Sequence, residues 1–277
     1  MLSNEELLRY LDAAVALAEQ AGALLKEGAL SAHPAESKSA STDLVTRYDR
    51  AAEELIVDGL FARFPTHRVL AEEGGARGGP AADPQAPLWL VDPLDGTTNF
   101  AHGLPLFSVS IACSVGGVTQ VGVVAAPALG LTFSAARGHG ARRNGRRLHV
   151  SDVATVDRAL LVTGFPYDRR TSQENNFSEF VEVKRRAQGV RRLGSAALDL
   201  SMVAAGAFDG YWEMRLKPWD VAAGMLLVEE AGGTVSDWRG GEASLERCEI
   251  LATNGRIHAE LSAILARAPR LALPDLV

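Results

Sequence analysis

Apolar and polar residues alternate along the first third of the chain in two helical patterns. Ser3-Asn4-Glu5-Glu6 matches a capping box, and the apolar residues after it recur every three or four positions up to Gly28. A second helix is predicted over residues 49–64, because the ring of Pro65 disfavours helical backbone in the residue before it. The polar stretch 31–42 between them indicates a loop.

Shorter apolar runs predict strands in the middle of the chain. Leu88-Trp89-Leu90-Val91 is typical of a buried strand, and Asn144-Gly145 is typical of a hairpin turn. Further strands are predicted near residues 106–114, 118–126 and 131–135.

After residue 150 the pattern changes to alternating strands and helices, which predicts an α/β half. Apolar runs lie at 159–163, 208–213 and 248–252, and helical patterns lie at 173–187, 195–206 and 219–232. We therefore divide the chain into an N-terminal α+β half, residues 1–150, and a C-terminal α/β half, residues 151–277. The motifs described below draw on both halves, which predicts one functional unit.

Composition narrows the class of protein. The chain has 277 residues, of which 47% are hydrophobic and 22% charged, as in soluble globular proteins. Its 28 basic and 34 acidic residues give a net charge of −6, which argues against non-specific nucleic-acid binding. Cys113 and Cys248 lie in apolar stretches and predict buried free thiols. Without a signal-peptide pattern or a membrane-spanning run, we expect a cytoplasmic protein that does not contact membranes.

The segment Asp92-Pro93-Leu94-Asp95-Gly96-Thr97-Thr98 carries the first candidate chemistry. Proline fixes one backbone angle and glycine permits an unusual one, so such a turn can point two carboxylates into one space. Carboxylate oxygens are ligands that Mg²⁺ prefers, and the amides of Gly96 and Thr97 are suited to phosphate oxygens. The same residue types are also common in surface turns.

Three other acidic positions favour a metal site over a surface turn. Glu72-Glu73 follows the apolar run 69–71, Asp49 ends a segment that begins at Asp43, and Asp220 follows Pro218 and Trp219. Each has a simpler explanation, since Asp49 and Asp220 suit helix N-caps and the glutamates suit a solvated loop. Their combination indicates a shared site.

This combination resembles the inositol monophosphatase family of lithium-sensitive, metal-dependent phosphatases. The family pattern W-x-x-D-P-x-D-G-T-T-N-F is met by residues 89–100, and W-D-x-A-A-G is met by residues 219–224. The segments 43–49 and 194–197 also fit, whereas Ala71 stands where many members have glycine. The resemblance covers most of the chain and implies the layered αβαβα sandwich of the inositol monophosphatase and fructose-1,6-bisphosphatase type.

The resemblance also implies a metal-assisted mechanism with two Mg²⁺ ions, and a third is common in the family. The implied metal ligands are Glu72, Asp92, the carbonyl of Leu94, Asp95 and Asp220, with Asp92 bridging the two ions. Thr97, paired with Asp49, and Glu72 are the residues implied to orient or deprotonate the attacking water. No covalent phosphoenzyme is required.

Substrate recognition is expected from both halves. The implied contacts are Asp95, Gly96, Thr97, Gly194, Ser195, Ala196, Glu213 and Asp220. Glu213 suits the hydroxyls of a polyol, although strand alternation also allows it to face outward. Lys38 is suited either to contact the phosphate or to lie in a solvated loop.

Inositol 1-phosphate is the leading substrate. Fructose 1,6-bisphosphate, histidinol phosphate and a 3′-phosphorylated nucleotide remain alternatives, although the chain shows no large insertion for an adenine ring.

Arginines and lysines cluster at residues 142–147, 184–186 and 191–192. We interpret them as solvated faces or a subunit interface, because the family commonly forms homodimers and the clusters lack interleaved aromatic residues. We expect no nucleic-acid partner. A regulatory member of the family, contacting the transcription machinery, is a further alternative, and Arg191-Arg192 is where such a contact is expected.

Overall fold

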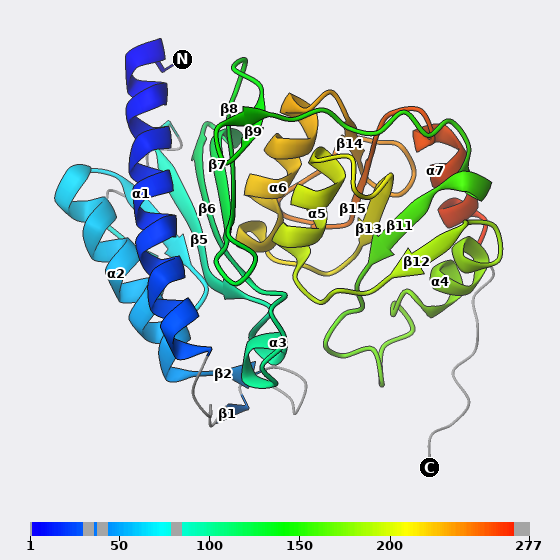
Figure 1. Cartoon of the computed structure of the whole chain (residues 1–277), viewed down its shortest axis with the longest axis horizontal. Helices are drawn as coiled ribbons and strands as arrows, with labels where there is room; N and C mark the ends of the chain where they lie inside the picture. The colour runs from blue at the N-terminus through cyan, green and yellow to red at the C-terminus, as the bar shows by residue number, and fades with distance from the viewer. Residues whose placement is uncertain (1, 30–35, 38–43, 79–84, 269–277) are drawn as a thin grey trace.

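Two large β-sheets, of eight and five strands, alternate with three layers of helices in the computed structural model of the chain (Figure 1). The structure describes residues 2–29, 36–37, 44–78 and 85–268. Helices α1 and α2 form the first layer, α5 and α6 lie between the two sheets, and α4 and α7 cover the far side of the second sheet. The predicted layered αβαβα architecture is therefore confirmed. The helices of these layers are α1 (Asn4–Gly28), α2 (Arg47–Arg63), α4 (Phe177–Lys184), α5 (Ala196–Ala204), α6 (Pro218–Glu230) and α7 (His258–Ala266).

The larger sheet has eight strands in the order β10-β9-β8-β7-β6-β5-β3-β4. Only the pair β3–β5 is parallel. Its strands are β3 (Arg68–Ala71), β4 (Gly75–Arg77), β5 (Leu88–Asp95), β6 (Ser108–Val115), β7 (Val118–Ala126), β8 (Leu131–Ala136), β9 (Ala141–Arg143) and β10 (Arg146–Arg147). The short helix α3 (Thr97–Ala101) follows β5 directly. The predicted turn at Asn144-Gly145 joins β9 to β10, with both residues at positive φ, as a two-residue hairpin requires.

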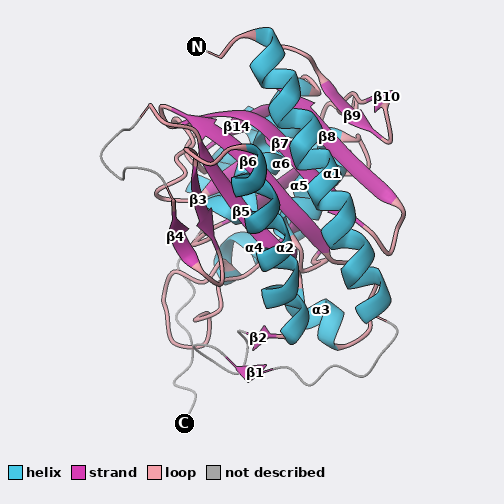
Figure 2. Ribbon diagram, turned by 90° about the vertical axis from the view of Figure 1, so that its left-hand side faces the viewer, coloured by secondary structure: helices cyan, strands magenta, loops and turns pink. Residues whose placement is uncertain are grey.

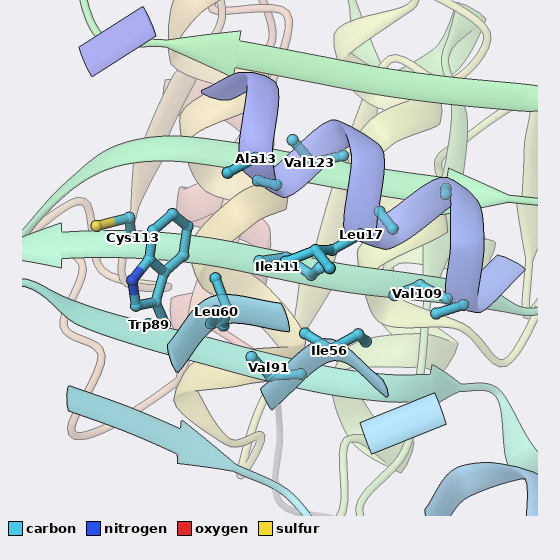
Figure 3. Packing of buried hydrophobic residues seen from close by; sticks show 14 of the residues in the cluster. Ala13, Leu17, Ile56, Leu60, Trp89, Val91, Val109, Ile111, Cys113 and Val123 are labelled. Atoms are coloured by element: carbon cyan, nitrogen blue, oxygen red, sulfur yellow. The ribbon is translucent and has the colours of Figure 1, made fainter. Parts of the chain in front are cut away.

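Helices cover both faces of this sheet, which explains why its strands are nearly continuous apolar runs. Figure 2 shows α1 and α2 crossing one face. Leu17 of α1 and Leu60 of α2 pack there against Trp89, Ile111 and Val123 (Figure 3). The opposite face, with Leu90, Ala112 and Val124, packs against α5 and α6. The sheet is thus held between two hydrophobic layers.

The smaller sheet has the strand order β12-β11-β13-β15-β14. Strand β11 pairs in parallel with β12 and β13, and the remaining pairs are antiparallel. The strands are β11 (Leu160–Thr163), β12 (Gly189–Arg191), β13 (Gly210–Glu213), β14 (Thr234–Ser236) and β15 (Ile250–Thr253), and a 3₁₀ turn at Val156–Arg158 precedes β11. All of its strands follow residue 150, whereas those of the larger sheet precede it.

Some predicted elements differ from the observed ones. The helix predicted over 173–187 is shorter, because Asn176 has a left-handed φ of 68° and α4 begins only at Phe177. Much of the loop predicted over 31–42 lies outside the described residues, but β1 (Glu36–Ser37) pairs with β2 (Leu44–Val45) in a ribbon that we did not predict. Cys113 and Cys248 are buried and free, as predicted. Among the described residues, no helix is long and apolar enough to cross a membrane.

Candidate functional site

A bulge in β5 brings Asp92 and Asp95 to the same face of the larger sheet. In a regular strand, residues three apart point to opposite faces. Here Asp92 pairs with Ser110 and Asp95 with Ser108, so that Pro93 and Leu94 together oppose a single residue of β6. Leu94 packs into the core under α1 and α2, and the two carboxylates point to the other side. Gly96, at a left-handed φ of 94°, then ends the strand and begins α3.

The carboxylate of Asp95 accepts hydrogen bonds from four groups. The hydroxyl of Ser195 donates at 2.6 Å, and the backbone amides of Ala196 and Ala197, in the first turn of α5, donate at 3.1 and 2.8 Å. Ser108 donates at 3.3 Å. Burial raises the pKa of Asp95, and these hydrogen bonds lower it. Asp95 therefore joins the larger sheet to α5.

The carboxylates of Glu72, Asp92 and Asp220, among others, line a cavity of about 400 Å³ together with Asp95. Burial raises the pKa of Asp92 well above its ordinary value, and the charges of Glu72, Asp95 and Asp220 raise it further. Burial likewise raises the pKa of Asp220. This concentration of like charge, with one Asp92 oxygen held at 3.0 Å by the amide of Leu94, fits a hard divalent cation bound between the carboxylates.

Among the described residues, no three acidic, histidine or cysteine side chains form a group close enough to hold a metal ion. Like charges without a cation between them repel one another.

A pair formed by a hydroxyl and a carboxylate lies at the edge of this cavity. The hydroxyl of Thr97 lies 3.0 Å from Oδ1 of Asp49 and 3.0 Å from the carbonyl of Leu94. The other oxygen of Asp49 accepts hydrogen bonds from the amide and hydroxyl of Thr46, which is the N-cap of α2. Asp49 is fully buried, and burial raises its pKa. The structure thus joins Thr97 and Asp49, as predicted for the pair.

The helix-capping explanation of Asp49 and Asp220 needs a correction. Neither is an N-cap, because each is the third residue of its helix and accepts a hydrogen bond from the N-cap backbone. For Asp220 the donor is the amide of Lys217, at 2.8 Å. Each carboxylate is therefore oriented by its helix through one of its two oxygens.

Glu213 lies in the wall of the cavity, at the end of β13. Its side chain is only 8% exposed and accepts a hydrogen bond of 2.8 Å from the hydroxyl of Tyr211, so the outward-facing alternative was wrong. Burial raises the pKa of Glu213 to about 7, although the Tyr211 hydrogen bond and the charge of Arg192 lower it. A Cβ on Gly164 would lie 2.0 Å from Oε1 of Glu213, so a larger residue at this position would displace the Glu213 carboxylate.

The remaining predicted residues are placed as follows. Gly96, Thr97, Gly194, Ser195 and Ala196 also line the cavity. Lys38 and Asp43 lie outside the described residues.

Several polar residues near the cavity were missed by the sequence analysis. Ser108 and Ser110 interrupt an apolar strand, and this interruption was the available signal. Asp199 lies buried in α5, where burial and the charges of Glu213 and Asp95 raise its pKa well above its ordinary value. Arg192 lines the cavity, whereas its neighbour Arg191 does not.

Comparison with known proteins identifies the family and supports the fold. A family model described as the inositol monophosphatase family matches residues 6–270. The chain belongs to the inositol monophosphatase family. Membership supports a phosphatase activity.

Individual members of the family carry two kinds of name. An inositol-1-monophosphatase from a Synechocystis species is 48% identical over 235 residues, which cover 85% of this chain and 81% of that protein. The Nus factor SuhB of Pseudomonas aeruginosa is 49% identical over 218 residues, covering 76% and 79%. Among solved structures, the inositol monophosphatase of an Anabaena (Nostoc) species superposes with a TM-score of 0.87 at 44% identity, covering 96% of this chain and 98% of that one.

Replacing Glu213 tests the environment of the cavity wall. Because the pKa of about 7 lies above the ordinary value of 4.5, burying Glu213 becomes destabilising as the pH rises from 4.5 to 7. Glu213→Gln removes this titration and keeps an acceptor for Tyr211. The difference in free energy of unfolding between the variant and the unmodified protein should therefore shift in favour of the variant by about 2–3 kcal/mol from pH 5 to pH 8.

The measurement is urea unfolding in EDTA at both pH values. Glu54→Gln, at an exposed position of α2, is the matched control and should show no such gain. An equal difference at pH 5 and pH 8 for Glu213→Gln would show that Glu213 titrates near its ordinary value.

Proposed function

We propose that this protein is a Mg²⁺-dependent phosphatase that hydrolyses inositol 1-phosphate to inositol and phosphate. The observation that carries the proposal is the bulge in β5, which turns Asp92 and Asp95 toward Glu72 and Asp220 in one cavity. Four carboxylates in one cavity repel a phosphate dianion unless cations neutralise them. Family membership supports the same chemistry.

In this proposal, Glu72, Asp92, the carbonyl of Leu94, Asp95 and Asp220 hold two cations, and a third remains an expectation. Bound Mg²⁺ supplies charge neutralisation and Lewis acidity at the phosphate. The chain itself orients the reactants. The Thr97 hydroxyl donates to Asp49 and keeps lone pairs free to accept a hydrogen bond from the attacking water, which Glu72 helps to deprotonate.

We propose that the alcohol part of the substrate lies against the wall of the cavity that contains Glu213. Glu213 is the residue we propose to accept hydrogen bonds from substrate hydroxyls, and we propose that the backbone of Gly194 also contacts the alcohol part. The side-chain hydroxyl of Ser195 and the amide of Ala196 already donate to Asp95, so their proposed part is to hold Asp95 in place. The amides of Gly96 and Thr97 are proposed to bind phosphate oxygens. A cytoplasmic homodimer stays a prediction.

Removing one metal ligand should abolish hydrolysis. Asp92→Asn and Asp220→Asn each retain the size of the side chain but remove a charge that a cation needs. We expect kcat to fall at least about 100-fold, with a higher Mg²⁺ requirement, as measured by phosphate release. Asp58→Asn, at an exposed position of α2, should remain as active as the unmodified protein. Near-normal Mg²⁺-dependent activity in either site variant would contradict the assignment.

A panel of phosphate monoesters tests the substrate. We expect inositol 1-phosphate to have a higher kcat/KM than fructose 1,6-bisphosphate, histidinol phosphate or a 3′-phosphorylated nucleotide. Glu213→Gln should raise KM for inositol 1-phosphate about tenfold, because a carboxylate accepts hydrogen bonds more strongly than an amide. If another ester has a higher kcat/KM, the substrate assignment is wrong, but the proposed metal-dependent mechanism is unaffected.

A regulatory role is the second candidate, because several relatives are named Nus factor SuhB, at up to 49% identity. The two roles can be distinguished by expressing variants in cells that lack this protein. If hydrolysis is the function, Asp220→Asn should fail to restore growth or gene expression. Full restoration by a variant that accumulates normally but lacks phosphatase activity would favour the regulatory role.

A further inference from the structure

The aromatic residue Tyr167 is exposed in the lining of the cavity. It lines the cavity together with Phe165 and Trp219, and it is 61% exposed, the largest fraction among the large apolar and aromatic residues that the structure describes. A single exposed aromatic residue needs no explanation on an outer surface, but in the wall of a reaction cavity it is available to a bound substrate. The cavity walls exclude part of the solvent, and this desolvation and the charges of Asp220 and Glu72 raise the pKa of Tyr167.

The segment that carries Tyr167 is fixed on both sides of it. Before it, the ring of Phe165 packs 5.4 Å from the ring of Phe177 in α4. After it, the amide and the guanidinium of Arg169 both donate to the carbonyl of Pro166, at 3.1 and 3.2 Å. Tyr167 is therefore presented by a turn with defined contacts.

This segment belongs to the wall of the cavity that contains Glu213. Strands β11 and β13 are parallel neighbours, so the residues that follow them leave the sheet side by side. Gly164 lies against the carboxylate of Glu213, and Asp168 forms an ion pair with Arg215 at 2.7 Å. Tyr167 lies between these two contacts, on the side of the cavity proposed to bind the alcohol part of the substrate.

We propose that Tyr167 is a specificity-determining residue whose ring packs against the C–H face of a cyclic alcohol. The inference rests on the proposed phosphatase function. A cyclic polyol has hydroxyls around its rim and C–H groups on its faces, so Glu213 can accept the hydroxyls while the aromatic ring covers an apolar face. An open-chain polyol has no rigid ring face and gains less from this contact.

The test compares inositol 1-phosphate with glycerol 1-phosphate. Both esters carry one phosphate and a hydroxyl on the neighbouring carbon, but only the first has a ring. The ratio of their kcat/KM values is measured with Mg²⁺ for the unmodified protein, Tyr167→Ala and Tyr167→Phe. We expect the unmodified protein to favour inositol 1-phosphate and Tyr167→Ala to reduce the ratio about tenfold, mainly through KM. Tyr167→Phe keeps the ring and should keep the ratio.

Leu129→Ala is the matched control, since it removes an exposed apolar side chain between β7 and β8, outside the cavity lining. It should leave the ratio unchanged. An unchanged ratio in Tyr167→Ala, including an equal loss for both esters, would overturn the proposal. A ratio that falls as far in Tyr167→Phe would assign the selection to the hydroxyl and overturn the ring contact.

These outcomes can be distinguished from a failure of the proposed function. If the unmodified protein hydrolyses inositol 1-phosphate, that function stands whatever the variants show. If it hydrolyses neither ester, the proposed function fails and the role of Tyr167 fails with it.

Discussion

The hydrogen bonds that the Asp95 carboxylate accepts from α5 are the interaction on which the arrangement of the site depends. They join residues 100 positions apart in the chain. A buried carboxylate is costly, but the amides at a helix N-terminus favour a negative charge. Two other polar contacts strengthen the same junction, since the amide of Asn99 donates to the carbonyl of Leu193 and the hydroxyl of Ser110 donates to the carbonyl of Trp219. The cavity therefore exists only when both halves are folded together.

Backbone amides orient three acidic residues in and beside the cavity. Asp49 and Asp220 each use one oxygen to bind the start of their own helix. Asp92 binds the amide of Leu94 in the same way. Backbone amides thus fix these carboxylates at the cost of placing like charges together, a cost that a bound cation removes.

Much of this arrangement was predictable from the sequence, because it depends on local signals. The capping box at Ser3 and the turn at Asn144-Gly145 are formed as predicted. The layered fold followed from the resemblance. What could not be predicted depends on strand register and on contacts between distant loops. Ser108 reaches Asp95 only because of how β5 pairs with β6, and the amides of Ala196 and Ala197 reach it only because α5 packs against the larger sheet.

The bulge in β5 has a consequence for how the sequence encodes the site. Everywhere else in this strand, alternate residues point to the same face, so the face of each side chain depends on whether its position is odd or even. The extra residue between Asp92 and Asp95 changes that parity once. Without it, Asp95 would point into the apolar layer under α1 and α2, away from every donor that now binds it. The one extra residue in β5 therefore determines whether Asp95 faces the cavity or the apolar core.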